Sequence, residues 1–185
     1  MLHVIEGNKF WNNRSSSCSQ TRALKVAREL YFHAYVRGML GKMWATLTGR
    51  TRHLLNLNEV ETTGALQCCY RIGTETVPIR QIRGSQGRCR DFDCDFYPIQ
   101  NHTNSRWLRV ASARQQGIVL PPVELIQVGE IFFVQDGHHR VSVARAMGQE
   151  YIEAEVKVWQ MSGRQFGEDA NIVHRDVALC RPLSS

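Results

Sequence analysis

The most regular pattern in the chain lies in residues 123–148, which read VELIQVGEIFFVQDGHHRVSVARAMG. Apolar residues dominate 123–128 and 131–135, and a glycine separates the two runs, so the pattern predicts a β-hairpin. Residues 141–147 have apolar side chains at helical spacing and end at a glycine, which predicts a helix with a C-cap. Residues 152–158 alternate apolar and charged side chains, as a half-buried strand does. This half of the chain therefore predicts a sheet with a helix entered directly from a strand.

The turn between the second strand and the helix carries the most chemistry, with Asp136, Gly137, His138, His139 and Arg140 in succession. A helix that begins directly after a strand presents unpaired backbone N–H groups and the positive end of its dipole, which together bind anions. Gly137 lets the backbone approach a ligand, and Arg140 can hold a phosphate with two parallel hydrogen bonds. Asp136 is an N-cap, a magnesium ligand or a carboxylate that orients a histidine. The structural alternative is that Asp136 only caps the helix and that both histidines are satisfied polar groups.

A second glycine loop precedes this turn. Residues 84–93 read GSQGRCRDFD and contain two glycines, two arginines and two aspartates. Arg88 and Arg90 can clamp further phosphate oxygens, while Asp91 or Asp93 can bind a metal ion or act as a general base. The alternative is that the arginines and aspartates pair with one another and fix the loop. Two arginine-bearing glycine loops in one small domain favour a phosphate site more than either loop does alone.

The N-terminal part of the chain predicts one amphipathic helix. Apolar residues recur at helical spacing over residues 21–47. A bend or break is expected at Gly38 and Gly41, because glycine costs a helix interior roughly 1 kcal/mol relative to alanine. The Ser-rich residues 1–20 are expected to be poorly ordered. The apolar helix, which includes Trp44, must be buried within the chain or between chains, and packing on its own core is favoured over contact with a membrane surface.

Shorter elements are predicted between this helix and the hairpin. A capping box formed by Asn56 and Glu59 begins a short helix that continues to about residue 66. A strand is predicted over residues 77–82. Residues 105–116 predict a helix that is closed by the following glycine.

The order of elements and the motifs in residues 77–158 resemble the ParB/sulfiredoxin superfamily. GSxGRxRDFD, and DGHHR followed by VSVAR, recur in this arrangement in bacterial proteins described as carrying a ParB-like nuclease domain. The resemblance implies an α+β fold, with a small core of mixed sheet and helices and an N-terminal helical extension. It divides the chain into an extension at 1–72, a core at 73–160 and a C-terminal tail at 161–185.

The resemblance also implies that the loop before the helix handles nucleotide phosphates. By position, Gly137 and Arg140 match the last phosphate-contacting motif of the ParB CTP-binding domain. His138 stands where sulfiredoxin carries its reactive cysteine, so sulfiredoxin chemistry is not expected. Free serine kinases of the superfamily carry a loop similar to DGHxR, which is the nearest fit. Their catalytic acid lies on an earlier segment, for which Asp91 and Asp93 are the candidates.

The composition is that of an ordinary globular protein. The 185 residues are 43% hydrophobic and 22% charged, which excludes wholesale disorder. No apolar stretch reaches the ~20 residues of a membrane span, and the N-terminus lacks a signal peptide's apolar segment, so we expect a cytoplasmic protein. The six cysteines show no C-x-x-C spacing, so we expect free thiols and no zinc site.

The net charge of +6, with 19 arginines against 4 lysines, favours anionic partners, although such a balance also serves simply to solvate a surface. The first hypothesis is a nucleotide-binding protein, an Mg-dependent phosphotransferase or nucleotide hydrolase that takes ATP, ADP or CTP with Mg²⁺. Its catalytic candidates are Asp136, His138 and Asp91. Its candidate phosphate-binding residues are Ser85, Arg88, Arg90, Gly137, His138, His139 and Arg140.

The alternative hypothesis is a non-catalytic DNA- or RNA-binding protein, or a nucleotide switch of the ParB type. Sequence-specific DNA binding is not expected, because the residues after Trp159 show no helix-turn-helix pattern. Non-specific contact with nucleic acid and formation of a homo-oligomer both stay open. A nuclease activity is least favoured, since no acidic metal-binding cluster is present in the sequence.

Overall fold

The computed structural model describes residues 9–49, 52–63 and 65–162. Along the chain its elements are α1 (Lys9–Thr48), β1 (Leu55–Asn56), α2 (Leu57–Thr63), β2 (Ala65–Pro78), the 3-10 helix η1 (Ile79–Gln81), β3 (Ile82–Ser85), the 3-10 helix η2 (Asn101–Thr103), α3 (Asn104–Gln115), β4 (Val123–Val128), β5 (Ile131–Asp136), α4 (His138–Ala146) and β6 (Tyr151–Ser162). The strands form a six-stranded sheet in the order β1-β3-β5-β4-β6-β2. The fold is therefore mixed α/β, as the sequence predicted.

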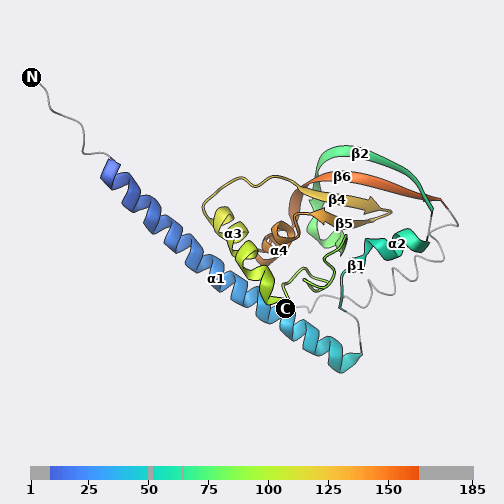
Figure 1. Ribbon diagram of the computed structural model, residues 1–185, viewed down its shortest axis with the longest axis horizontal. Helices are drawn as coiled ribbons and strands as arrows, with labels where there is room; N and C mark the ends of the chain where they lie inside the picture. The colour runs from blue at the N-terminus through green and yellow to red at the C-terminus, as the bar shows by residue number, and fades with distance from the viewer. Residues whose placement is uncertain (1–8, 50–51, 64, 163–185) are drawn as a thin grey trace, which may run out of the picture.

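Parallel and antiparallel pairs alternate through the centre of the sheet. β4 and β5 form the predicted antiparallel hairpin, while β3 pairs with β5, and β4 with β6, in parallel. Because β3 and β5 are parallel neighbours, their carboxyl ends lie at the same edge of the sheet. β2 and β6 form a long antiparallel ribbon that arches over the remaining strands (Figure 1) and contains irregularities at Leu66/Cys68 and at Arg71/Gly73.

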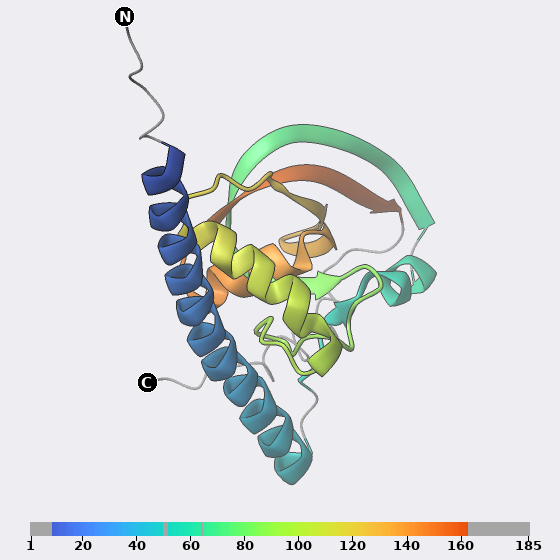
Figure 2. The same cartoon turned by 60° about the vertical axis from the view of Figure 1, so that its left-hand side comes forward.

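Different helices cover the two faces of the sheet. On one face Leu125 and Val134 pack in a core cluster with Val141 of α4. On the other face Ile126 packs with Leu57 of α2. α3 and α1 lie beyond α4, where side chains of all three helices form a further cluster that includes Ala27, Trp107 and Val143 (Figure 2). α4 is consequently packed between the sheet and the outer helices.

α1 is one continuous helix, which corrects two expectations. No break occurs at Gly38 or Gly41. A Cβ at Gly38 would lie 2.7 Å from the carbonyl oxygen of Pro98, so this glycine allows the helix to pack closely on the loop between β3 and η2. α1 begins at Lys9, so residues 9–20, expected to be poorly ordered, are helical. The helix extends beyond the residues that contact the core, and apolar spacing therefore did not mark its start.

The boundary between an N-terminal extension and a core was predicted at residues 72/73. It falls inside β2, and β1 also belongs to the sheet. Residues 68–72 are all exposed on this edge strand, so no alternation of apolar and polar residues reveals it. The predicted strand at 77–82 is instead the end of β2, a 3-10 turn and the start of β3, and α2 ends at Thr63 rather than near residue 66.

The other predicted elements agree closely with the structure. α3 is shifted by one residue from the predicted helix, and β6 continues to Ser162, into the predicted tail. The rest of that tail, from residue 163, lies outside the described residues, as do residues 1–8. The described cysteines Cys68, Cys69, Cys89 and Cys94 are free thiols, as predicted, whereas the Cys18 side chain and Cys180 are not described. Among the described helices, none is long and apolar enough to cross a membrane.

Candidate anion-binding site

The structure brings the two predicted glycine loops together at one edge of the sheet. Ser85 ends β3 and Asp136 ends the neighbouring parallel strand β5. The Ser85 Oγ atom lies 2.7 Å from Nε2 of His138, the first residue of α4. In addition, the backbone N–H of Gln86 donates to the carbonyl oxygen of Val134 over 2.9 Å. The loops that are far apart in the sequence therefore form a single site.

The N-terminus of α4 is not capped by a side chain. Gly137 occupies the N-cap position with a φ of 95°, and no side-chain hydrogen bond is made there. A Cβ at Gly137 would lie 2.7 Å from Val123 Cγ1, so glycine is required both for the left-handed backbone and for space. Asp136 is therefore not the N-cap, which was one of the three roles considered for it. No side chain therefore caps the positive end of the α4 dipole, although Gly137, His138 and His139 are themselves buried.

Both histidines of the turn are buried and held neutral. His138 is 5% exposed and stacks on the ring of Phe92, while His139 is 6% exposed and meets the same ring edge-on. Burial, followed by the positive charge of Arg88, lowers the pKa of each histidine to about 4. His138 uses its Nε2 on Ser85, whereas His139 Nδ1 is buried without a hydrogen-bond partner in the described part of the chain.

Cationic side chains surround the start of α4. Arg88 is anchored by its backbone N–H, which donates to Ser85 Oγ over 3.1 Å, and its side chain is 41% exposed. Asp91 lies 3.4 Å from Arg88 Nη1 and 3.3 Å from Nε2 of His102. Arg106, in the first turn of α3, contributes with Arg88 to the lowered pKa of His139. His102 and Arg106 were not predicted as site residues, because only the packing of η2 and α3 beside α4 brings them to the site.

Arg140 and Asp136 are used within the protein. The Arg140 Nη1 atom donates to the carbonyl oxygens of Pro121 and Pro122 over 2.6 and 2.7 Å, and its Nη2 donates to Asp136 over 2.6 Å. Arg140 thereby fixes the segment before β4 against α4. Arg90, by contrast, is exposed and makes no hydrogen bond or ion pair with the described residues. Of the predicted phosphate-binding arginines, Arg88 and Arg90 are the ones with exposed side chains.

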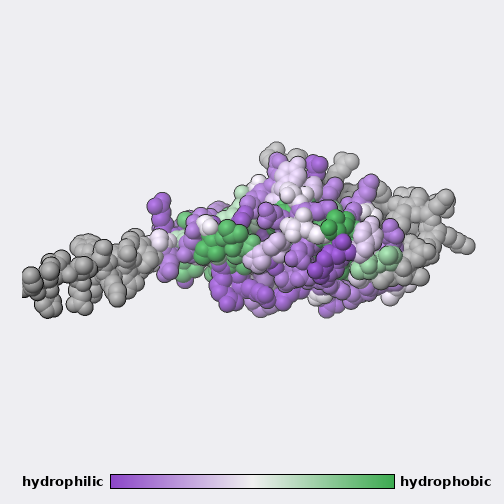
Figure 3. Space-filling view, turned by 90° about the horizontal axis from the view of Figure 1, so that it is seen from above, coloured by the Kyte–Doolittle hydropathy of each residue, from purple (hydrophilic) through white to green (hydrophobic). Residues whose placement is uncertain are grey.

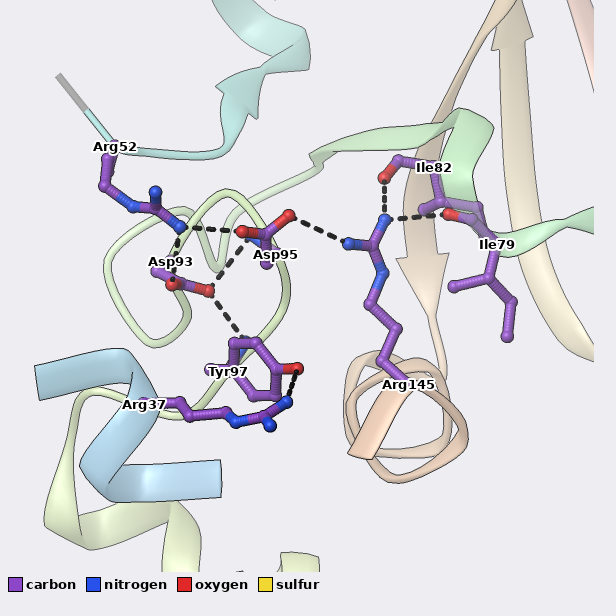
Figure 4. A network of polar contacts seen from close by, with 8 residues as sticks. All are labelled: Arg37, Arg52, Ile79, Ile82, Asp93, Asp95, Tyr97 and Arg145. Atoms are coloured by element: carbon purple, nitrogen blue, oxygen red, sulfur yellow. Dashed lines mark hydrogen bonds and ion pairs between the residues drawn. The ribbon is translucent and has the colours of Figure 1, made fainter. Parts of the chain in front are cut away.

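Asp93 belongs to a separate polar network (Figure 4). It is 1% exposed, and its Oδ1 accepts the backbone N–H groups of Asp95 and Tyr97. Asp95 in turn binds Arg52 and Arg145, at 2.7 and 3.1 Å. Burial, and secondly the charge of Asp95, raises the pKa of Asp93 to about 7. Asp93 therefore fixes the loop through backbone N–H groups and Arg52, whereas the pairing of the loop's own arginines and aspartates, the alternative stated from the sequence, is seen at Arg88 and Asp91.

The arrangement is suited to binding an anion more than to nucleophilic chemistry. The hydroxyl of Ser85 is at hydrogen-bond distance from a neutral histidine, but Ser85 is 0% exposed and cannot reach a substrate. Within residues 9–49, 52–63 and 65–162, no three His, Cys, Asp or Glu side chains are grouped so that they could hold a metal ion. The exposed side chains at this edge are Arg88 and Arg90, whose guanidinium groups fit phosphate oxygens, whereas Gly137, His138 and His139 at the start of α4 are buried.

The fold and this site define a small mixed α/β protein in which a strand leads through glycine into an uncapped helix. The structure is similar to the crystal structure of sulfiredoxin from Arabidopsis thaliana. The two share 20% sequence identity with a TM-score of 0.32, over 45% of this chain and 82% of that chain. The chain matches no protein-family model and no curated protein sequence.

Proposed function

We propose that the protein binds a nucleotide through its phosphate groups at the edge formed by the Ser85–Arg88 loop and the N-terminus of α4. The observation that carries the proposal is the start of α4, which has no side-chain cap and lies near Arg88, whose positive charge contributes to the lowered pKa of His138. Helix dipole, backbone donors and guanidinium all stabilise negative charge at one place. The neutral histidines beneath them contribute shape and leave the positive charge to the arginines.

Phosphoryl transfer or nucleotide hydrolysis is the reaction class proposed for this site. Such chemistry requires mainly positioning and neutralisation of charge. Asp91 is better placed than Asp136 to take part, since it lies between Arg88 and His102, whereas Asp136 is bound to Arg140. A magnesium ion would reach the site with the nucleotide, held in part by the phosphates themselves.

Titration calorimetry with ATP, ADP, CTP and GTP, with and without magnesium, tests the proposal. Arg88→Ala should weaken the binding of the preferred nucleotide by roughly 10- to 100-fold, the loss expected for a charge-assisted hydrogen bond. The variant should still fold, because Arg88 makes one half-exposed ion pair. Release of phosphate from the bound nucleotide then reports turnover.

Arg114→Ala is the matched control, because this exposed arginine lies at the far end of α3 and should leave affinity unchanged. Equal affinities of the wild type and Arg88→Ala would contradict the proposal. A folded protein that binds none of the nucleotides, yet binds DNA or RNA with strong salt dependence, would favour the nucleic-acid hypothesis instead.

A further inference from the structure

α1 has two apolar faces on opposite sides of the helix. The inner face carries small residues, Ala27, Ala34 and Gly38, which pack on α3 and on the loop at Pro98. The outer face carries large apolar side chains that are exposed over four turns of the helix. We call this set the α1 stripe, and it consists of Phe32, Val36, Leu40, Met43, Trp44 and Leu47.

The stripe is unlike the apolar exposure elsewhere on the molecule. On the face shown in Figure 3 the surface is largely hydrophilic and its apolar side chains lie in separate small patches. Scattered exposure of this kind is normal for a monomer, whereas a contiguous apolar row marks an interaction site. The packing expected from the sequence accounts for the inner face of α1 and leaves Trp44 and its neighbours exposed.

α1 is held firmly against its own core, so the stripe is presented in a fixed orientation. Gly38 brings the helix backbone against Pro98. From the preceding residue, Arg37 Nη1 donates to the hydroxyl of Tyr97 over 3.3 Å (Figure 4). Gly41 packs against Arg52 and Asp93 of the polar network. The helix therefore cannot roll its outer face inward without losing these contacts.

The spacing of the stripe fits a partner helix. Val36, Leu40, Met43 and Leu47 are separated by four, three and four residues, which is the repeat of a coiled-coil seam. Phe32 and Trp44 flank that seam. Neither Arg37 nor Lys42 falls on it, so two identical stripes can meet without bringing like charges together. An interface between identical surfaces related by a two-fold axis is the commonest way in which such a patch is satisfied.

The exposed apolar area of the stripe is comparable with one side of a typical dimer interface. Taking each large apolar side chain at roughly 200 Å² when fully exposed, the six members of the stripe leave on the order of 700 Å² per chain open to water. A specific interface buries roughly 800 Å² per partner.

We propose that a second copy of this chain covers the α1 stripe, so that the protein is a homodimer joined through paired α1 helices. The inference does not depend on nucleotide binding, because it uses a different element and a different face. A lipid surface is the competing occupant. It is disfavoured by the heptad-like spacing, which a flat bilayer does not require.

Sedimentation velocity of the full-length protein over a range of concentrations tests the proposal. The wild type should sediment as a dimer of the 21.2 kDa chain. Leu40→Glu places a charge at the centre of the seam and should weaken dimerisation by about 100-fold or more, because an unpaired charge would be buried. Glutamate and leucine have similar helix propensities, so α1 itself should persist.

Val119→Glu is the matched control, because Val119 is 87% exposed and lies outside the stripe, so this variant should remain dimeric. If circular dichroism shows that Leu40→Glu is unfolded, Leu47→Glu near the end of α1 makes the same test with less risk to the fold. A monomeric wild type at every concentration would overturn the proposal. So would an undiminished dimer in a folded Leu40→Glu or Leu47→Glu variant, or a wild-type monomer that binds phosphatidylserine vesicles.

Discussion

Arg140 illustrates how the role of a single residue depends on its packing. The sequence predicts that this arginine holds phosphate, because it follows a glycine turn at the start of a helix. In the structure its guanidinium donates to two carbonyl oxygens and a carboxylate. The distant segment that supplies those carbonyls, at Pro121 and Pro122, cannot be located from the motif alone.

Arg140→Ala should therefore reduce stability as well as any ligand affinity. Loss of three charge-assisted hydrogen bonds at a largely buried side chain should lower the free energy of unfolding by about 2–3 kcal/mol. Chemical denaturation followed by circular dichroism measures this loss. Arg140→Lys should recover only part of it, since an ammonium group lacks the planar fork that reaches both carbonyls. An Arg140→Ala variant as stable as the wild type would show that these bonds contribute little.

The candidate site was predictable in part at the residue scale. Ser85, Arg88 and His138 come together as expected, because parallel neighbouring strands place their carboxyl ends at one edge. His102 and Arg106 were not predictable, since neither lies in a motif. Local patterns identify a turn that can bind an anion, but the side chains contributed by a neighbouring helix are determined by tertiary packing.

Among the secondary-structure elements, the hairpin and α4 were predicted correctly and β2 was not. β4 and β5 lie in the centre of the sheet, so their apolar side chains are buried and their pattern is plain in the sequence. β2 lies at the edge, where Tyr70 and Ile72 are exposed, and its residues resemble those of a loop. The two glycines of α1 were misinterpreted as helix breakers, because their use in close packing is visible only in three dimensions.

Gly38→Ala tests this role of glycine in α1. Alanine favours a helix by roughly 1 kcal/mol over glycine, so an exposed position would gain stability. Here the new Cβ would lie 2.7 Å from the Pro98 carbonyl oxygen, and the backbone would have to move. We expect a net loss of about 1–3 kcal/mol in the free energy of unfolding.

Gly41→Ala is the comparison for that variant. Its Cβ would meet only side-chain atoms, with Arg52 Nε nearest at 3.2 Å, so the cost should be smaller than at Gly38. Thermal or chemical denaturation of the two variants side by side decides the question. A Gly38→Ala variant more stable than the wild type would contradict the close packing of α1 on this loop.

For the whole molecule, two groups of buried residues make the free energy of unfolding depend on pH in opposite directions. His138 and His139 have pKa values lowered from 6.5 to about 4. Their contribution to the free energy of unfolding is lost as the pH falls through this range, because the unfolded chain binds protons that the folded chain does not. Asp93 has a pKa raised from 3.8 to about 7, so its contribution is present at low pH and is lost as the pH rises toward 7. The two effects oppose each other between about pH 4 and 6.5.

Asp93→Asn separates these effects. Asparagine retains an oxygen that can accept the N–H groups of Asp95 and Tyr97, but it does not titrate. The free energy of unfolding of the variant should rise more steeply with pH than that of the wild type, by up to about 1.4 kcal/mol per pH unit, the value for one proton. Urea denaturation at several pH values between 4 and 6.5 measures both slopes. Parallel profiles would show that Asp93 is already ionised in the folded protein throughout this range.

The ribbon of β2 and β6 also bears on how the protein avoids aggregation. β2 ends the sheet, so the outer side of its 14-residue backbone faces no further strand within the described chain. Such an edge is a template on which strands of other molecules can add. The irregularities at Leu66/Cys68 and Arg71/Gly73 interrupt the even spacing of donors and acceptors that an incoming strand would need. The curved, interrupted strand therefore discourages edge-to-edge growth with other molecules.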